Sequence, residues 1–196
     1  MPRIVVSEFL TLDGVMQAPG DPNEDRSGGF EYGGWQLKFF DDIFGKTMTD
    51  AFSETGGLLL GRRTYDIFAA YWPKQANDDP LGGIMNKLPK HVVSTTLEEP
   101  LEWENSTLVK GDVVEALRAL RAEHGKDLLV FGSGELVQTL ITNGLVDEYR
   151  LMIHPIVLGK GKRLFRDGTA NTRLQLKQTT PTTTGVLMNS YVPADA

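Results

Sequence analysis

The stretch from Leu128 to Leu136 constrains the fold of this chain more than any other, because an apolar run there meets two glycines and then becomes amphipathic. Four large apolar residues in succession are typical of a strand covered on both faces. Gly132 and Gly134 allow a tight turn in which backbone amides approach a ligand closely. Apolar residues then recur at helical spacing, at Leu136, Val137, Leu140 and Ile141. The stretch therefore predicts a buried strand, a glycine turn and a helix whose N-terminus is suited to phosphate.

The turn by itself does not identify a ligand. Gly-x-Gly occurs in many turns, and Val137 stands where the dinucleotide-binding fingerprint has its third glycine. The chain has no Walker pattern either. A plain strand-to-helix connection explains these residues as well as an anion site does, so the rest of the sequence must decide.

A second turn of the same kind follows the apolar run Leu58 to Leu60. It contains a glycine, two cations and a threonine, at Gly61, Arg62, Arg63 and Thr64. These residues suit an anion site, but a solvated basic turn with a capping threonine accounts for them equally well.

Length and composition indicate a single folded domain over residues 1–196. Hydrophobic residues make up 40% of the chain, which is enough for a core. There is no cysteine and there are only three scattered histidines, so we expect no disulfide and no metal site. The net charge of -6 argues against a nucleic-acid partner. The chain shows no signal peptide and no membrane-spanning window, which predicts a cytoplasmic protein without a membrane partner.

Apolar spacing predicts the other helices and loops. Residues 17–34 are rich in Gly, Pro, Asp and Asn, so we expect a long loop that either covers an active site or makes an ordinary surface excursion. One helix is predicted over residues 37–52. Residues 71–89 are predicted to be mostly loop, and Asp112 is predicted to cap a helix that extends to residue 125.

Strands are predicted from residue 4 to near residue 11 and at residues 91–94, 107–109 and 146–157, with an antiparallel pair formed by residues 174–176 and 186–188. His154 lies in the long strand, where a histidine is expected to be packed and hydrogen-bonded rather than catalytic. Residues 159–163 form a flexible basic loop that lacks the P-loop spacing.

Strands that alternate with helices predict an α/β fold of three layers, α/β/α, with a mainly parallel central sheet and antiparallel C-terminal strands. In such sheets ligands bind beyond the carboxyl ends of the strands. The Gly61 and Gly132 turns both follow strands. Two candidate anion sites on one edge suit a ligand with more than one phosphate.

Four motifs in order carry a family resemblance, in residues 11–20, 60–65, 131–136 and 146–159. Together they resemble the dihydrofolate-reductase-like superfamily, and within it the branch of the RibD C-terminal domain, the reductase domain of the riboflavin-biosynthesis deaminase/reductase. The resemblance spans nearly the whole chain. It implies a dihydrofolate-reductase-like fold, NADPH as the hydride donor and a homodimer.

The resemblance also implies site residues. The cofactor would contact Gly61, Arg62, Arg63, Thr64, Ser94, Thr95, Gly132, Ser133, Gly134, Glu135 and Leu136. Asp13 is the catalytic candidate, although Asp-Gly also forms turns without any chemical role. Gly14, Met16 and Phe40 are expected beside the substrate.

Two departures from the family patterns narrow the function. The helix comparable to the pterin-binding one offers Asp41 and Asp42 without the usual flanking residues, and we expect these carboxylates to be solvated. The deaminase half of the riboflavin enzyme needs zinc-binding cysteines, so only a stand-alone reductase is possible.

The sequence thus predicts an NADPH-dependent reductase of a small heterocyclic substrate, with 5-amino-6-(5-phosphoribosylamino)uracil as a candidate. Dihydrofolate reduction and a non-catalytic nucleotide-binding module are the alternatives. The arginines of the Gly61 turn are the sole support for NADPH over NADH.

Overall fold

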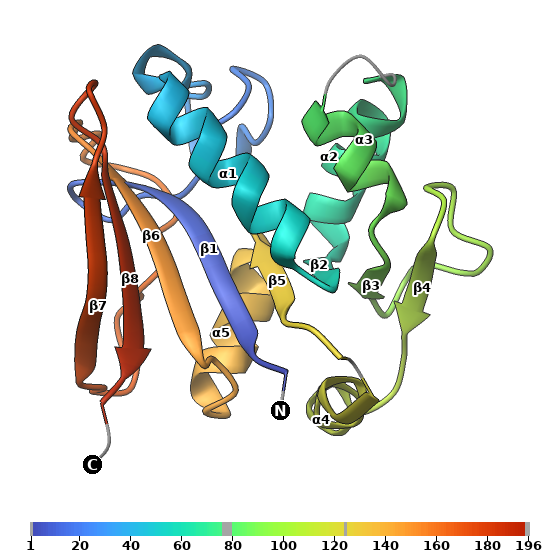
Figure 1. The fold of residues 1–196 in the computed structure, drawn as a ribbon. Helices are drawn as coiled ribbons and strands as arrows, with labels where there is room; N and C mark the ends of the chain where they lie inside the picture. The colour runs from blue at the N-terminus through green and yellow to red at the C-terminus, as the bar shows by residue number, and fades with distance from the viewer. Residues whose placement is uncertain (1, 76–79, 124, 195–196) are drawn as a thin grey trace. The chain divides into compact units, whose positions relative to one another are not determined.

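Eight strands form one mixed sheet in the order β4-β3-β2-β5-β1-β6-β8-β7 (Figure 1). The structure is a computed structural model that describes residues 2–75, 80–123 and 125–194. The strands are β1 (Ile4–Thr11), β2 (Gly57–Gly61), β3 (Lys90–Val93), β4 (Ser106–Val109), β5 (Leu128–Phe131), β6 (Glu148–His154), β7 (Leu174–Pro181) and β8 (Leu187–Pro193). The α-helices are α1 (Asp42–Glu54), α2 (Arg62–Tyr71), α3 (Pro80–Lys87), α4 (Val113–Glu123) and α5 (Gly134–Thr142). The predicted α/β sheet, mainly parallel with antiparallel C-terminal strands, is confirmed.

The chain divides into two compact units, and the boundaries fall inside β1, inside α1 and directly before β6. The first unit comprises Met1–Val6 and Thr47–Asp147, and the second comprises Ser7–Lys46 and Glu148–Ala196. Whether they behave as the single domain expected from the sequence stays a prediction.

Leucine-rich strands form the core of the first unit. The three leucines of β2 are fully buried, as are Leu128 and Val130 of β5. β2 pairs in parallel with β3 on one side and with β5 on the other (Figure 1). A strand with neighbours on both sides and covered faces has no polar position to fill, which explains the uninterrupted apolar runs.

The second unit is built on the antiparallel strands β6, β8 and β7 (Figure 1). The predicted loop at residues 17–34 belongs to this unit and carries its own small core. That core consists of Val15, Ala18, Phe30 and Trp35, which are at most 5% exposed. The indole Nε1 of Trp35 also donates to the backbone oxygen of Gln17 at 2.8 Å. The loop is therefore fastened by packing within its own unit.

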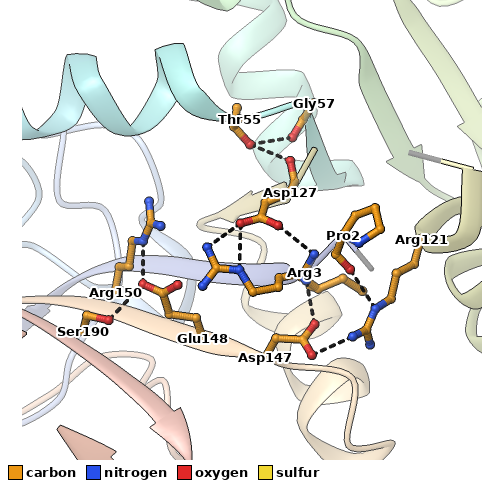
Figure 2. Close-up of polar contacts among 11 residues, drawn as sticks. Pro2, Arg3, Thr55, Gly57, Arg121, Asp127, Asp147, Glu148, Arg150 and Ser190 are labelled. Atoms are coloured by element: carbon orange, nitrogen blue, oxygen red, sulfur yellow. Dashed lines mark hydrogen bonds and ion pairs between the residues drawn. The ribbon is translucent and has the colours of Figure 1, made fainter. Parts of the chain in front are cut away.

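Two carboxylates hold the N-terminal segment in the first unit (Figure 2). Asp127 accepts hydrogen bonds from the backbone N–H and the Nε of Arg3, both at 2.8 Å. Asp147 accepts from the backbone N–H of Ile4 at 2.8 Å and from the guanidinium of Arg121 at 2.7 Å. These charge-assisted bonds tie the start of β1 to residues more than a hundred positions away.

We expect Asp147→Asn to lower the free energy of unfolding by about 1 to 2 kcal/mol, because Arg121 loses its counter-charge in a partly buried place. Asp66→Asn is the matched control. It breaks an i,i+4 pair with Arg62 whose side chains are about half exposed, and such pairs contribute less than about 0.5 kcal/mol. Urea denaturation compares the two variants. Equal losses in the free energy of unfolding would contradict a stabilising role for the bond between Arg121 and Asp147.

Three predicted elements differ from the structure. The apolar repeat over residues 37–52 does not form one helix: a short 3-10 turn (Leu37–Phe39) precedes α1, and Phe40 between them is extended. Asp41 then caps α1 by accepting the N–H of Phe44 at 2.8 Å. The segment 71–89 contains α3, so its prediction as mostly loop is wrong for residues 80–87. β6 ends at His154 because Pro155 follows, so it is shorter than predicted.

Candidate functional site

Parallel pairing brings three turns to one edge of the first unit's sheet. Gly61 is opposite Val93 of β3, and Leu59 is opposite Val130 of β5. The residues that follow each strand therefore emerge at the same edge. The predicted cofactor residues of the Gly61 turn (61–64), the Ser94 turn (94–96) and the Gly132 turn (132–136) thus share this edge, where α/β sheets bind ligands.

Hydroxyl groups join the Gly61 turn directly to the Gly132 turn. The backbone N–H of Ser133 donates to the Oγ1 of Thr64 at 2.8 Å, and the N–H of Gly61 donates to the Oγ of Ser133 at 2.9 Å. The Ser133 hydroxyl donates in turn to the carbonyl of Phe131 at 3.2 Å. Thr64 therefore does not cap its own helix, as one interpretation of the sequence had it, and serves the neighbouring turn.

The backbone of the Gly132 turn is left-handed at two successive residues. The φ angle is +61° at Gly132 and +55° at Ser133. A Cβ on Gly132 would lie 3.0 Å from the Oγ1 of Thr64. A non-glycine residue at positive φ is uncommon, and Ser133 is held there by its three bonds.

Arg62 of the Gly61 turn already has partners within the first unit. The Nε of Arg62 donates to Asp66 at 2.8 Å, and its Nη1 donates to the Oγ1 of Thr96 at 2.5 Å. The Ser94 hydroxyl accepts the N–H groups of Thr96 and Leu97, which closes the Ser94 turn. Arg62 thereby links α2 to the turn after β3. Arg63 and Thr95 are exposed beside these groups.

Asp13 of the second unit binds the segment that follows β6. Its Oδ1 accepts the Thr11 hydroxyl at 2.6 Å and the N–H of Leu158 at 3.2 Å, and its Oδ2 accepts the N–H of Gly159 at 2.8 Å. Arg163 approaches from the same segment, donating its Nε to the Asp13 carbonyl at 2.8 Å. The carboxylate therefore anchors residues 158–163 to the turn after β1.

These bonds keep Asp13 ionised. Partial burial acts against the charge, but the hydrogen bonds from Thr11, Gly159 and Leu158 outweigh it and hold the pKa of Asp13 below its ordinary value. An ionised carboxylate that already accepts three hydrogen bonds is poorly suited to donate a proton.

The three residues predicted beside the substrate lie in the second unit. Gly14 has a φ of +79°, which the turn after β1 requires. Met16 is half-buried, and its N–H donates to the Lys162 carbonyl at 2.8 Å. Phe40 is 59% exposed. A Cβ on Gly45 would lie 2.8 Å from the Phe40 ring, so this mid-helix glycine provides space for the ring.

The basic loop at residues 159–163 is engaged within its own unit. The Nζ of Lys162 donates to Asp25 at 2.6 Å, and burial of Asp25 is outweighed by this bond and by those from Ser27, so its pKa is about 2. The Gln17 amide accepts the N–H of Lys162 and donates to the carbonyls of Asp25 and Ser27. A hollow of about 250 Å³ lies here, lined by Gln17, Ser27, Gly28, Phe30, Lys160, Gly161 and Lys162. None of the residues predicted beside the substrate lines it.

His154 is fully buried and is packed as the sequence predicts. Its Nδ1 lies 2.9 Å from the Met152 carbonyl and 3.2 Å from the Leu10 carbonyl, so Nδ1 carries the proton. Four aromatic rings surround the imidazole at centroid distances of 5.1 to 5.9 Å, those of Phe9, Trp35, Phe39 and Phe44. The Nε2 is buried without a hydrogen-bond partner among the described residues. Burial lowers the pKa of His154, more than its two carbonyl contacts raise it.

This environment predicts loss of stability in acid. The unfolded chain binds a proton at His154 near pH 6.5, whereas the folded chain binds it only at lower pH. The contribution of the neutral imidazole to the free energy of unfolding is therefore fully present above pH 6.5 and is lost as the pH falls below it. We expect wild type to lose stability relative to His154→Asn, by up to about 1.4 kcal/mol per pH unit, as the pH falls from 7 to 5. Asparagine keeps a donor and does not titrate. Parallel unfolding curves at both pH values would contradict this.

Several residues that shape the site were not predicted from the sequence. Gln17 and Asp25 bind Lys162, and Arg163 binds the Asp13 carbonyl, so these residues fasten the segment after β6 to the segment after β1. These contacts join residues far apart in the sequence, so only the fold reveals them. The sequence also did not predict a role for the buried Lys90, which lies at the start of β3, at the opposite end of the strand from the Ser94 turn. Its Nζ donates to the carbonyls of Met85 and Asn86 at the end of α3, where it stabilises the last turn.

The described part of the chain, residues 2–75, 80–123 and 125–194, contains no group of three acidic or histidine side chains placed to hold a metal ion. Over the same ranges, no helix is long and apolar enough to cross a membrane.

Comparison with known proteins identifies relatives over nearly the whole chain. The family model of the RibD C-terminal domain matches residues 2–188. The protein YyaP of Bacillus subtilis (strain 168), which is uncharacterized, is 32% identical over 195 residues, covering 96% of this chain and 94% of its own length.

Solved structures share the fold at lower identity. A putative riboflavin biosynthesis protein from Shewanella sp. PV-4 superposes with a TM-score of 0.74 at 23% identity, over 98% of this chain and 99% of its own. A pyrimidine reductase-like protein from Corynebacterium diphtheriae gives a TM-score of 0.64 at 12% identity, over 100% and 93%. At these identities the similarity establishes the fold alone.

Proposed function

The chain belongs to the RibD C-terminal domain family, and from this premise we propose that it is an NADPH-dependent reductase of a small heterocyclic substrate. One observation carries the proposal: the Gly61 and Gly132 turns are bonded to each other at the edge of the sheet where ligands of α/β folds bind. Two glycine turns, each opening a helix, suit the two phosphates of a dinucleotide. A ligand with a single phosphate would need only one such turn.

The pyrophosphate, the adenosine ribose and the 2′-phosphate of the cofactor each have a proposed partner in the first unit. The helix starts of the Gly61 and Gly132 turns receive the pyrophosphate, and the Ser94 turn receives the adenosine ribose. Arg62 and Arg63 favour the 2′-phosphate of NADPH by charge-assisted bonds. The bond from Arg62 to Asp66 must open for this, which an exposed ion pair permits at little cost.

When bound, NADPH supplies the hydride. The protein's part is to bind and orient the cofactor and the acceptor and to exclude water. Asp13 acts by holding residues 158–163 in place with its ionised carboxylate, next to the proposed substrate contacts Gly14, Met16 and Phe40. The proton that completes reduction comes from a group other than this carboxylate.

The proposed substrate class is a pyrimidine such as 5-amino-6-(5-phosphoribosylamino)uracil. The name of the Corynebacterium neighbour supports a pyrimidine, and that of the Shewanella neighbour supports riboflavin biosynthesis. Asp41 argues against dihydrofolate. Its carboxylate accepts the N–H and the hydroxyl of Thr183 at 2.7 and 2.6 Å, so it is occupied within the second unit.

Cofactor oxidation with purified protein tests the proposal. NADPH and NADH are titrated by thermal shift, and NADPH oxidation at 340 nm is then followed with the pyrimidine and with dihydrofolate as acceptors. We expect saturable stabilisation by NADPH and turnover with the pyrimidine. Absence of any shift at millimolar cofactor would refute the proposal, whereas binding without turnover of any acceptor would favour a non-catalytic nucleotide-binding module.

We also propose a homodimer. β7 ends the strand order of the sheet, and Leu176 on it is 49% exposed. An edge strand presents unpaired N–H and C=O groups that can pair with a strand of a second chain. Light scattering coupled to size exclusion measures the mass in solution.

A further inference from the structure

We propose that Thr64 and Ser133 are positioning residues whose hydroxyls lock the two phosphate-binding turns together. This inference rests on the proposed cofactor. The family resemblance assigns both residues to cofactor contact, and in the structure the hydroxyl of each accepts a backbone N–H of the other turn. The Thr64 hydroxyl accepts the Ser133 N–H, and the Ser133 hydroxyl accepts the Gly61 N–H.

The two bonds run in opposite directions between the turns. Each turn provides one hydroxyl and one backbone amide, so the lock resists both sliding and separation of the start of α2 from the start of α5. Ser133 is only 8% exposed, which shields its bonds from competing water. Its hydroxyl hydrogen is directed to the Phe131 carbonyl, so its lone pairs face the Gly61 amide.

Neighbouring positions are adapted to this geometry. Gly132 has no Cβ, and one placed there would lie 3.0 Å from the Thr64 Oγ1. Ser133 takes the left-handed conformation, in which its N–H points to Thr64 and its side chain to Gly61. The first bond inside α5 runs from the Val137 N–H to the Ser133 carbonyl. The amides just before Val137 point out of the start of the helix, and these are the groups we assign to the ligand.

The lock predicts a split between cofactor affinity and chemistry. Preorganised turns bind a pyrophosphate without first paying to be ordered, so loosening them weakens binding and leaves hydride transfer unchanged. We expect Thr64→Val to raise the KM for NADPH about 10-fold with kcat within about 2-fold of wild type, a size set by one hydrogen bond. Ser133→Ala, which removes the other bond, is expected to act alike.

Two further variants separate an effect on the position of the turns from a general loss of stability. Thr64→Ser keeps the hydroxyl and is expected to bind NADPH as wild type does. Thr55→Val removes a buried hydroxyl that donates to the Asp127 carbonyl at 2.9 Å, before β5 and away from the turns. It is expected to destabilise the protein with no change in KM. An equal rise in KM in Thr55→Val would overturn the inference.

Amide exchange measured by NMR on the protein without cofactor tests the lock independently of the proposed function. Thr64→Val is expected to speed exchange of the Ser133 amide about 10-fold relative to Thr64→Ser, and Ser133→Ala to do so for the Gly61 amide. Unchanged exchange in both variants would refute the lock. If instead exchange responds but wild type does not bind NADPH, the lock stands as a structural feature and the assignment to a cofactor fails.

Discussion

Gly132→Ala is expected to lower the free energy of unfolding by about 2 to 3 kcal/mol and to weaken NADPH binding by at least about 10-fold, as loss of the Thr64 hydroxyl does. The left-handed conformation costs a residue with a Cβ about 1 kcal/mol. The added methyl also lies 3.0 Å from the Thr64 Oγ1, so the hydroxyl that accepts the Ser133 amide must give way by a few tenths of an ångström. The substitution therefore loosens the lock and shifts the start of α5.

Gly144→Ala provides the matched control, because Gly144 has the same φ of +61° and nothing within 4 Å of an added Cβ. It is expected to show the conformational cost of about 1 kcal/mol and normal cofactor binding. Urea denaturation and NADPH thermal shift on both variants measure the two effects. Equal behaviour of the two would show that contact with Thr64 is unimportant.

Asp13→Ala is expected to reduce kcat/KM about 100-fold, because a small displacement of substrate-positioning groups has effects of that order. The variant loses the acceptor of the Thr11 hydroxyl and of the Leu158 and Gly159 amides. We also expect a loss of about 2 kcal/mol in the free energy of unfolding. Faster amide exchange at Leu158 and Gly159 should accompany both changes.

A second Asp-Gly turn in the same unit serves as its control. Asp167 is exposed and precedes Gly168, whose φ of +85° resembles that of Gly14. Asp167→Ala is expected to leave turnover, stability and exchange unchanged. If Asp13→Ala instead loses turnover while the Leu158 and Gly159 amides remain protected, Asp13 contacts the reacting atoms directly, as the family resemblance implies.

The local sequence pattern was sufficient to predict elements whose side chains are all buried or whose capping partners are neighbours in the chain. The leucine run of β2 and the apolar run of β5 are buried strands as predicted, because continuous apolar sequence has no alternative to burial. Asp112 caps α4 through the amides of Val114 and Glu115. Such hydrogen bonds join neighbours in the chain, so they can be predicted from the sequence.

The same reasoning failed where distant residues decide the local structure. The helical repeat of residues 37–52 is interrupted before α1, where Asp41 turns to Thr183 of the β7–β8 hairpin. Gly82 within α3 has the Gln75 carbonyl 2.7 Å from where its Cβ would be, so a glycine that suggests loop by composition is required by packing. Thr183 is 142 residues from Asp41, and Gln75 lies outside α3, so neither contact follows from the local apolar pattern.

The sequence by itself determined the α/β fold, the family and the two glycine turns, because periodicity and motif order are properties of the chain. Only the tertiary structure decided how the polar groups of those turns are used. Parallel pairing of β2 with β5 brings the Gly61 turn and the Gly132 turn together, and the Thr64 and Ser133 hydroxyls then bind protein amides. Likewise, Asp13 is an occupied acceptor because the segment after β6 lies against it. A hydrogen bond depends on atoms within about 3 Å, and only the folded chain fixes which atoms these are.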